Sequence, residues 1–74
     1  MIEELSIVAL TVDLPDYNLR TGDTGTIVDV PPQGETYVVE FLTLLGKTVA
    51  VIEVAQDQIR PVDEQEIASA RILG

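Results

Sequence analysis

The stretch Leu19–Val30, LRTGDTGTIVDV, places an aspartate between two glycines and then runs into β-branched residues. Glycines at a corner permit backbone angles that a side chain penalises, and an aspartate there accepts hydrogen bonds from nearby backbone N–H groups. A phosphate-binding loop would need a strand before the glycines, a helix after them and a cation nearby. Because a strand follows and Asp23 lies between Gly22 and Gly25, we interpret the stretch as the corner of a small β-fold.

Apolar runs on both sides of this corner have the length and the two-residue period of short strands. The expected strands are Leu5–Val12, Gly25–Val30, Thr36–Leu42 and Lys47–Val54, and Ile59–Val62 holds one turn of 3₁₀ helix and a brief edge strand. In the run Thr36–Leu42, the side bearing Tyr37, Val39 and Phe41 is expected to face inward. Five short strands predict a small barrel.

The connections carry residues typical of turns and loops. We expect a long loop over Asp13–Asp23, a turn over Pro31–Glu35 and a tight connection over Thr43–Gly46, in which Gly46 can adopt a positive φ. After the last strand, Asp63 precedes Glu66 by three positions, the spacing of a capping box. The sequence therefore predicts a short helix over Glu64–Leu73, and it divides into a β-barrel over residues 1–62 and a helical tail over residues 63–74.

The composition excludes several function classes. The 74 residues include no cysteine and no histidine, which argues against disulfides, thiolate or imidazole metal sites and cysteine nucleophiles. Thirteen acidic residues against four basic ones give a net charge of −9, which repels a phosphate backbone and suits a basic protein partner. The four cations are scattered in sequence, at Arg20, Lys47, Arg60 and Arg71. We expect a cytoplasmic protein with no cofactor, no nucleic-acid partner and no membrane segment.

Four residues are candidates for contact with a partner: Tyr17, Leu19, Leu44 and Leu45. Tyr17 and Leu19 fall in the long loop, where an aromatic residue can anchor an interface or fold back as a lid over the barrel. Leu44 and Leu45 fall in a hairpin tip, where few neighbours can bury them. They form either an interface or a packing surface under the tail, with Ile67 and Ile72 as partners.

Acidic residues offer two weaker alternatives. Asp13, Asp16 and Asp23 could bind a hard cation, but their spacing matches no EF-hand, and turn chemistry explains them. Glu40 and Glu53 could form a catalytic pair, but a chain of this size offers little concave space, so we interpret them as a solvated face.

The corner also resembles a known pattern. Gly22, Asp23, Gly25, Ile27 and Val30 match the opening Gly-Asp-x-Gly-x-Val-x-x-Val of many SH3-like barrels, including the KOW type. Over about the first sixty residues, VALTVDLPDYNLRTGDTGTIVDV, YVVEF, GKTVAVIEV and IRPV resemble the prokaryotic family catalogued as domain of unknown function 4926. The resemblance implies a small five-stranded SH3-like barrel, supplies no agreed activity, and suggests association with mobile-element or toxin–antitoxin-like gene pairs. The sequence departs from the family pattern at Thr43–Leu45 and in its tail.

Three hypotheses follow. The first is a non-catalytic, acidic protein-interaction module, such as an antitoxin, immunity protein or accessory subunit, that binds a protein partner or self-associates. The second is a KOW-like nucleic-acid-associated module, which would need its cations gathered on one face. The third is a small enzyme or metal-binding protein. Size, charge and the missing catalytic residue types favour the first.

Overall fold

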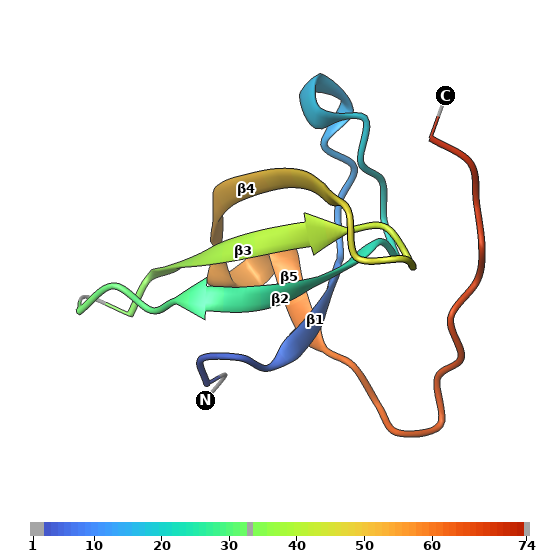
Figure 1. Cartoon of the computed structure of the whole chain (residues 1–74). Coiled ribbons are helices and arrows are strands. Elements are labelled where there is room, and N and C mark those ends of the chain that lie inside the picture. Colours follow the sequence, from blue (N-terminus) through green and yellow to red (C-terminus); the bar gives the residue numbers. More distant parts are fainter. Residues whose placement is uncertain (1–2, 33, 74) are drawn as a thin grey trace.

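The computed structural model describes residues 3–32 and 34–73, and within them five strands form one antiparallel sheet (Figure 1). The strands are β1 (Ile7–Leu10), β2 (Thr24–Asp29), β3 (Thr36–Leu42), β4 (Thr48–Ala55) and β5 (Ile59–Pro61). Their order across the sheet is β4-β3-β2-β1-β5, so the last strand returns beside the first. The mainly β architecture predicted from the period-two runs is confirmed.

The sheet curls, but it does not close. A register shift at Val28 separates the pairs Ile27↔Val39 and Asp29↔Val38, and a second shift follows Phe41 in the β3–β4 pair. Such bulges bend and twist a strand. β4 and β5 are nevertheless the two free edges, because β5 has three residues, pairs with β1 and ends at Pro61, which has no N–H to donate. The sheet therefore does not close into the barrel that the sequence predicted.

The core lies inside the curl of the sheet, where every strand contributes to one cluster. Its buried members are Val8, Leu10, Leu19, Ile27, Tyr37, Val39, Phe41, Val54 and Ile59. The inward face predicted for β3 is confirmed, because its three alternate residues Tyr37, Val39 and Phe41 are at most 5% exposed. Between β4 and β5, the 3₁₀ helix η2 (Gln56–Gln58) forms just before the place where the sequence predicted such a turn.

The two glycines of the corner have different reasons to be glycine. Gly22 has a φ of +93°, a left-handed conformation that other residues rarely adopt. Gly25 is buried in β2, where a Cβ would lie 2.6 Å from Cγ1 of Val39 and 2.8 Å from the Glu40 carbonyl oxygen. The corner is fastened to β1, because the Gly22 N–H donates to the Leu10 carbonyl at 2.9 Å. The corner interpretation thus explains Gly22, whereas Gly25 is required by the close packing of β2 against β3.

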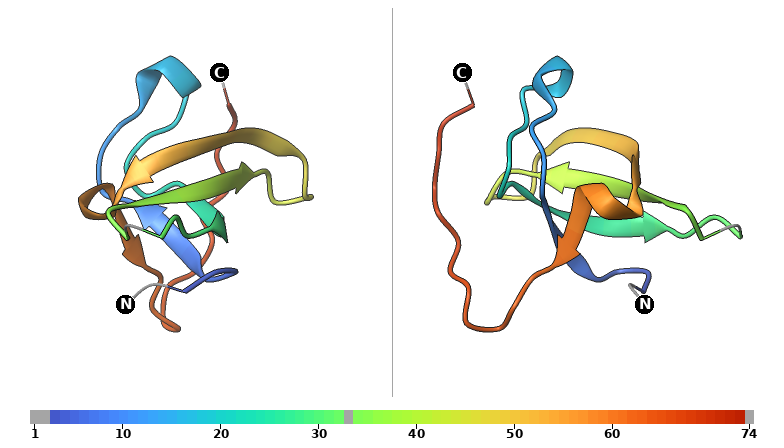
Figure 2. Two further views of the ribbon diagram at one scale, coloured as in Figure 1. Left: turned by 90° about the vertical axis from the view of Figure 1, so that its left-hand side faces the viewer. Right: turned by 180° about the vertical axis from the view of Figure 1, so that it is seen from behind.

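The predicted C-terminal helix is wrong. Residues 63–73, which we call the tail, make one turn and then run extended beside the sheet (Figures 1 and 2). The turn does use the predicted capping residues: the Gln65 N–H donates to Asp63 Oδ1, and the Asp63 N–H donates to Glu66 Oε1, each at 2.8 Å. The capping interaction therefore forms without the helix.

Two physical reasons explain the extended tail. Isolated helices of fewer than about 12 residues are marginal in water without a buried apolar face. At about 100° of rotation per residue, a helix would point Ile67, Ile72 and Leu73 in three directions roughly 100–140° apart. No single face could bury all three, so tertiary packing gives this segment no helical stability. Among the described residues, no helix has the length and hydrophobicity needed to cross a membrane.

Candidate partner-binding surface at the hairpin tip and tail

The β3–β4 hairpin ends in a tight turn that holds two leucines away from the core. The Thr43 N–H donates to the Lys47 carbonyl at 2.8 Å, and the Gly46 N–H donates to the Thr43 carbonyl at 2.9 Å. Gly46 has the positive φ that the sequence predicted, at +90°. The turn leaves Leu44 70% and Leu45 98% exposed. We call these two residues the leucine tip.

The tail and the sheet enclose an open groove of about 590 Å³ beside the leucine tip. Its apolar lining includes large side chains from β1, the end of β3, the tip and the tail: Ile7, Leu42, Leu44, Leu45, Ile67 and Leu73. The tip and Ile67 therefore share one groove, although Ile67 remains 91% exposed and covers neither leucine. Ile72, 93% exposed, does not line the groove. Of the two alternatives for the leucines, packing under the tail does not occur, because Leu44 and Leu45 stay 70% and 98% exposed.

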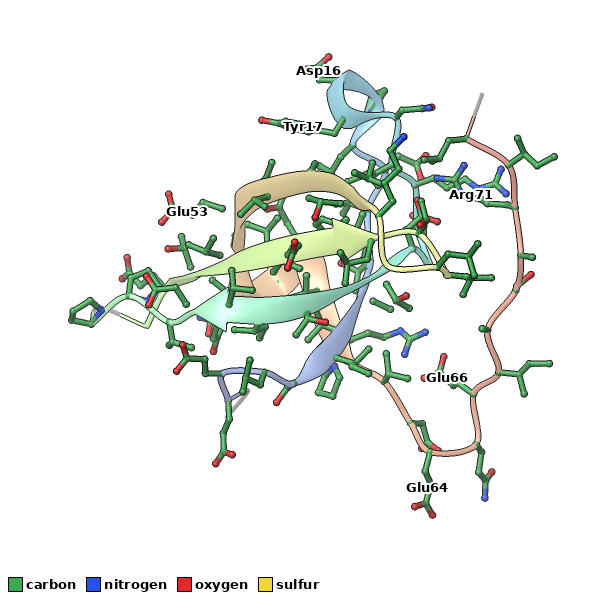
Figure 3. All side chains as sticks on the ribbon, in the orientation of Figure 1. Asp16, Tyr17, Glu53, Glu64, Glu66 and Arg71 are labelled. Atoms are coloured by element: carbon green, nitrogen blue, oxygen red, sulfur yellow. The ribbon has the colours of Figure 1, made fainter. Side chains whose placement is uncertain are left out.

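The first part of the tail, residues 63–66, lies at the bottom in Figure 1, and we call it the lower tail. It is held by Arg60 of β5. Arg60 Nη1 and Nη2 donate to Glu66 Oε1 and Oε2 at 2.7 and 2.8 Å, a bidentate ion pair. The guanidinium and then the Asp63 N–H lower the pKa of Glu66 from 4.5 to about 2. Glu66 points from the tail toward the sheet, whereas Glu64 points away (Figure 3).

The last part of the tail, around Arg71, is the upper tail. Its Arg71 side chain points toward the glycine corner (Figure 3). Arg71 Nε donates to Asp23 Oδ1 at 2.8 Å, and Nη2 donates to Asp23 Oδ2. Nη2 also donates to the Asn18 carbonyl oxygen at 3.2 Å. The hydrogen bonds from Arg71 are the main cause that lowers the pKa of the Asp23 carboxyl. We call Asp23 and the Asn18 carbonyl the guanidinium site.

The long loop carries the other two candidate residues. The 3₁₀ helix η1 (Pro15–Tyr17) leaves Tyr17 47% exposed and outside the core cluster. After it, a β-bridge between Leu14 and Leu19 turns the chain inward, so Leu19 is 5% exposed and belongs to the core. Leu19 therefore offers no surface to a partner, and Tyr17 does not line the groove that Leu44 and Leu45 share.

The remaining acidic residues have structural partners or face solvent. Asp13 Oδ1 accepts hydrogen bonds from the N–H and hydroxyl of Thr21, and the N–H is the larger cause that lowers the pKa of Asp13. Glu40 and Glu53 accept hydrogen bonds from cross-strand threonine hydroxyls at 2.6 and 2.7 Å. Over residues 3–32 and 34–73, no three acidic side chains converge in a way that could hold a metal ion.

Sequence reasoning missed the guanidinium site. Asp23 and Arg71 are separated by 48 positions, so no local pattern relates them. One signal was present in the sequence, the asparagine at position 18, because asparagine is among the few residues that tolerate a left-handed conformation. Asn18 adopts this conformation, with a φ of +59°. It caps η1, and its carbonyl oxygen is the one that Arg71 contacts.

The comparisons with known proteins identify a family and no activity. The sequence profile of the family described as Domain of unknown function (DUF4926) matches residues 4–61, which include all five strands. No curated protein and no solved structure matches the chain. The tail, with Glu66 and Arg71, lies outside the matched range. Because the match spans most of the 74 residues and the whole sheet, the chain belongs to the DUF4926 family.

Proposed function

We propose that this chain is a non-catalytic protein-interaction module that binds a basic protein partner through the leucine tip and the adjacent groove. The observation that carries the proposal is the exposure of Leu44 and Leu45 at the end of an ordered hairpin. Two adjacent leucines held in solvent expose apolar area without stabilising the core, and such patches commonly mark interfaces. An antitoxin, immunity protein or accessory subunit would use such a surface.

The net charge of −9 selects the kind of partner. A field of this sign accelerates encounter with a basic surface and opposes association of two identical chains. Apolar contacts at the leucine tip then set the lifetime of the complex, because related complexes differ mainly in their dissociation rates. We therefore favour a basic partner over self-association.

The proposal also covers the type of barrel and the cellular location of the chain. The strand order, with β5 beside β1, supports an SH3-like barrel opened between β4 and β5. A nucleic-acid role gains no support, because Arg60 and Arg71 are both paired with carboxylates. A cytoplasmic setting is consistent with a chain that uses no cysteine.

The test is solution mass by light scattering over a dilution series, for the chain alone and co-expressed with the product of the adjacent reading frame. We expect an 8.0 kDa monomer alone and a heteromeric species with the partner. Leu44→Ser with Leu45→Ser should weaken the heteromeric species, because the substitution removes the apolar contact but leaves the core intact.

The matched control is Ile72→Ser, which removes an equally exposed apolar side chain that does not line the groove. It should leave the complex unchanged. A monomer under both conditions, or equal weakening by both variants, would contradict the proposal. A stable homo-oligomer that the leucine variant dissolves would assign the tip to a second copy of the chain.

A further inference from the structure

The guanidinium site is formed by the body of the protein, independently of the tail. The Asp23 carbonyl accepts from the Leu10 N–H at 2.9 Å, and the Asp23 N–H donates to the Arg20 carbonyl at 3.0 Å. The Arg20 N–H in turn donates to Asp23 Oδ2 at 2.9 Å. These bonds fix the Asp23 backbone and one of its carboxylate oxygens before any arginine binds. The acceptor geometry is therefore preorganised for a planar bidentate donor.

The tail that fills this site is loosely attached. Within the described residues, no backbone-to-backbone hydrogen bond involves residues 67–73. The body holds the tail through the side chains of Arg71 and Glu66, and Ile67 and Ile72 are more than nine-tenths exposed. Both ion pairs remain reachable from solvent, because the side chains of Arg60 and Glu66 are 46% and 37% exposed and those of Arg71 and Asp23 are 21% and 18% exposed. A similar contact from outside can therefore replace the Arg71 pair.

The seated segment also shows what kind of ligand fits. Arg71 and Leu73 line the groove, as do residues 66–70 before them, whereas Ile72 is 93% exposed and does not line it. The pattern is arginine followed, two positions later, by an apolar residue. Beside it the leucine tip offers apolar surface that the tail leaves exposed.

We propose that Asp23 and the Asn18 carbonyl form an arginine-binding site that the chain fills with its own Arg71, and that an extended arginine-bearing segment of the basic partner displaces it. This inference rests on the proposed function and names the partner's contact. The net charge of −9 favours a cationic occupant over a second copy of this chain. A tethered competitor acts at an effective concentration in the millimolar range, so the partner must add contacts at the tip.

The test uses the full-length Arg71→Gln variant and a fluorescent peptide with the sequence of residues 68–74, ASARILG. Removing the internal arginine should expose the site. We expect the variant to bind the peptide at least about tenfold more tightly than the wild-type chain does, because competition from the tail is lost. A peptide with glutamine in place of its arginine should bind the variant at least about tenfold more weakly, since it lacks the bidentate donor. Peptide binding should move the Arg20 amide resonance, which reports on Asp23 Oδ2.

Equal affinity of the variant and the wild-type chain, equal affinity of the two peptides, or no saturable binding would each overturn the inference. Both peptides are measured on the same protein variant, so a difference in stability between the variant and the wild-type chain cannot produce the difference between the peptides. With the partner, Arg71→Gln should strengthen association and Asp23→Asn should weaken it.

Failure of this inference is distinguishable from failure of the proposed function. Peptide binding with no effect of the leucine variant on the complex would retain the arginine site and remove the tip. The reverse result would retain the tip alone. A homodimer that Arg71→Gln dissolves would mean that the occupant is the tail of a second copy, which also overturns the proposal.

Discussion

Arg71 and Asp23 are joined by a bidentate ion pair across 48 positions of sequence, with Nε of Arg71 2.8 Å from Oδ1 of Asp23. The pair connects the tail to the corner through which the chain enters β2. Asp23 therefore has two roles at once: its backbone fastens the corner to β1, and its side chain fixes the position of the tail. Asp23, between the two glycines, thus contacts both β1 and the tail.

Arg71→Gln should release the upper tail without unfolding the sheet. The substitution removes the ion pair with Asp23. Neither Arg71 nor its neighbour Ile72 belongs to the core cluster, so the packing of the core is unchanged. We expect the {¹H}-¹⁵N heteronuclear NOE of Ile72 and Leu73 to fall toward values of a flexible chain. The urea midpoint should stay close to that of the wild type.

Arg20→Gln is the matched control for this measurement. It removes the same charge near Asp23, but it leaves the Arg20 backbone N–H, which makes the hydrogen bond to that carboxylate. The tail should remain ordered. If both variants mobilise Ile72 equally, net charge near the corner holds the tail, and the specific pair does not.

Gly25→Ala should destabilise the fold more than Gly22→Ala. A Cβ at Gly25 would lie 2.6 Å from Cγ1 of Val39, and such overpacking typically costs about 1–3 kcal/mol. At Gly22 nothing lies within 4 Å of a Cβ, so the cost there is only the strain of a positive φ, about 1–2 kcal/mol. Urea unfolding of both variants measures the difference.

Gly22→Asn separates space from strain in the same experiment. Asparagine tolerates the left-handed region better than alanine does. It should recover part of the loss at Gly22, where there is room, and the same substitution at Gly25 should recover nothing. Equal losses at both positions would contradict the distinction between the two glycines.

Phe41→Ala should leave the chain largely unfolded, whereas Leu45→Ala should change stability by less than about 0.5 kcal/mol. Phe41 is 1% exposed in the centre of the core, and truncating such a residue costs about 3–5 kcal/mol. A domain of this size has little stability to lose. Leu45 is 98% exposed, so its truncation removes no buried area. Thermal unfolding measures both, and a large loss at Leu45 would place the tip in the core.

The strands could be predicted from the sequence because their information is local. The predicted strand Thr36–Leu42 coincides with β3, and the alternation of Tyr37, Val39 and Phe41 identifies its buried face. The bulge after Phe41 shows where this logic ends. It moves Val49 out of strict alternation, so that Val49 and Ile52 both pack against the core although they are three positions apart along β4.

The tail and the loop could not be predicted in the same way. Glu66 occupies its predicted capping position, yet Arg60 holds its carboxylate on the sheet, and no apolar face favours a helix beyond it. Leu19 falls in a polar loop, and the bridge to Leu14 that buries it is a property of the folded loop. Both outcomes depend on contacts that a one-dimensional pattern does not contain.

Acid should detach the lower tail through Glu66. The folded-state pKa of Glu66, about 2, lies below its ordinary value of 4.5, so the ionised form is the one that the fold stabilises. The contribution of the Arg60 pair is therefore complete above pH 4.5 and is lost as the pH falls toward about 2. Asp23 shifts in the same direction, so the upper attachment weakens in acid as well.

A pH titration of the side-chain carboxyl resonances measures this directly. Arg60 and Asp63 are the charged groups beside Glu66, and Arg60→Gln should return the Glu66 midpoint toward 4.5 because it removes the main stabilising donor. The same variant should leave Asp23 titrating below 3.8, since Arg71 remains in place there. If Glu66 already titrates near 4.5 in the native chain, then the lower tail is not held by this ion pair, and the Arg71 pair alone positions the segment that lines the groove.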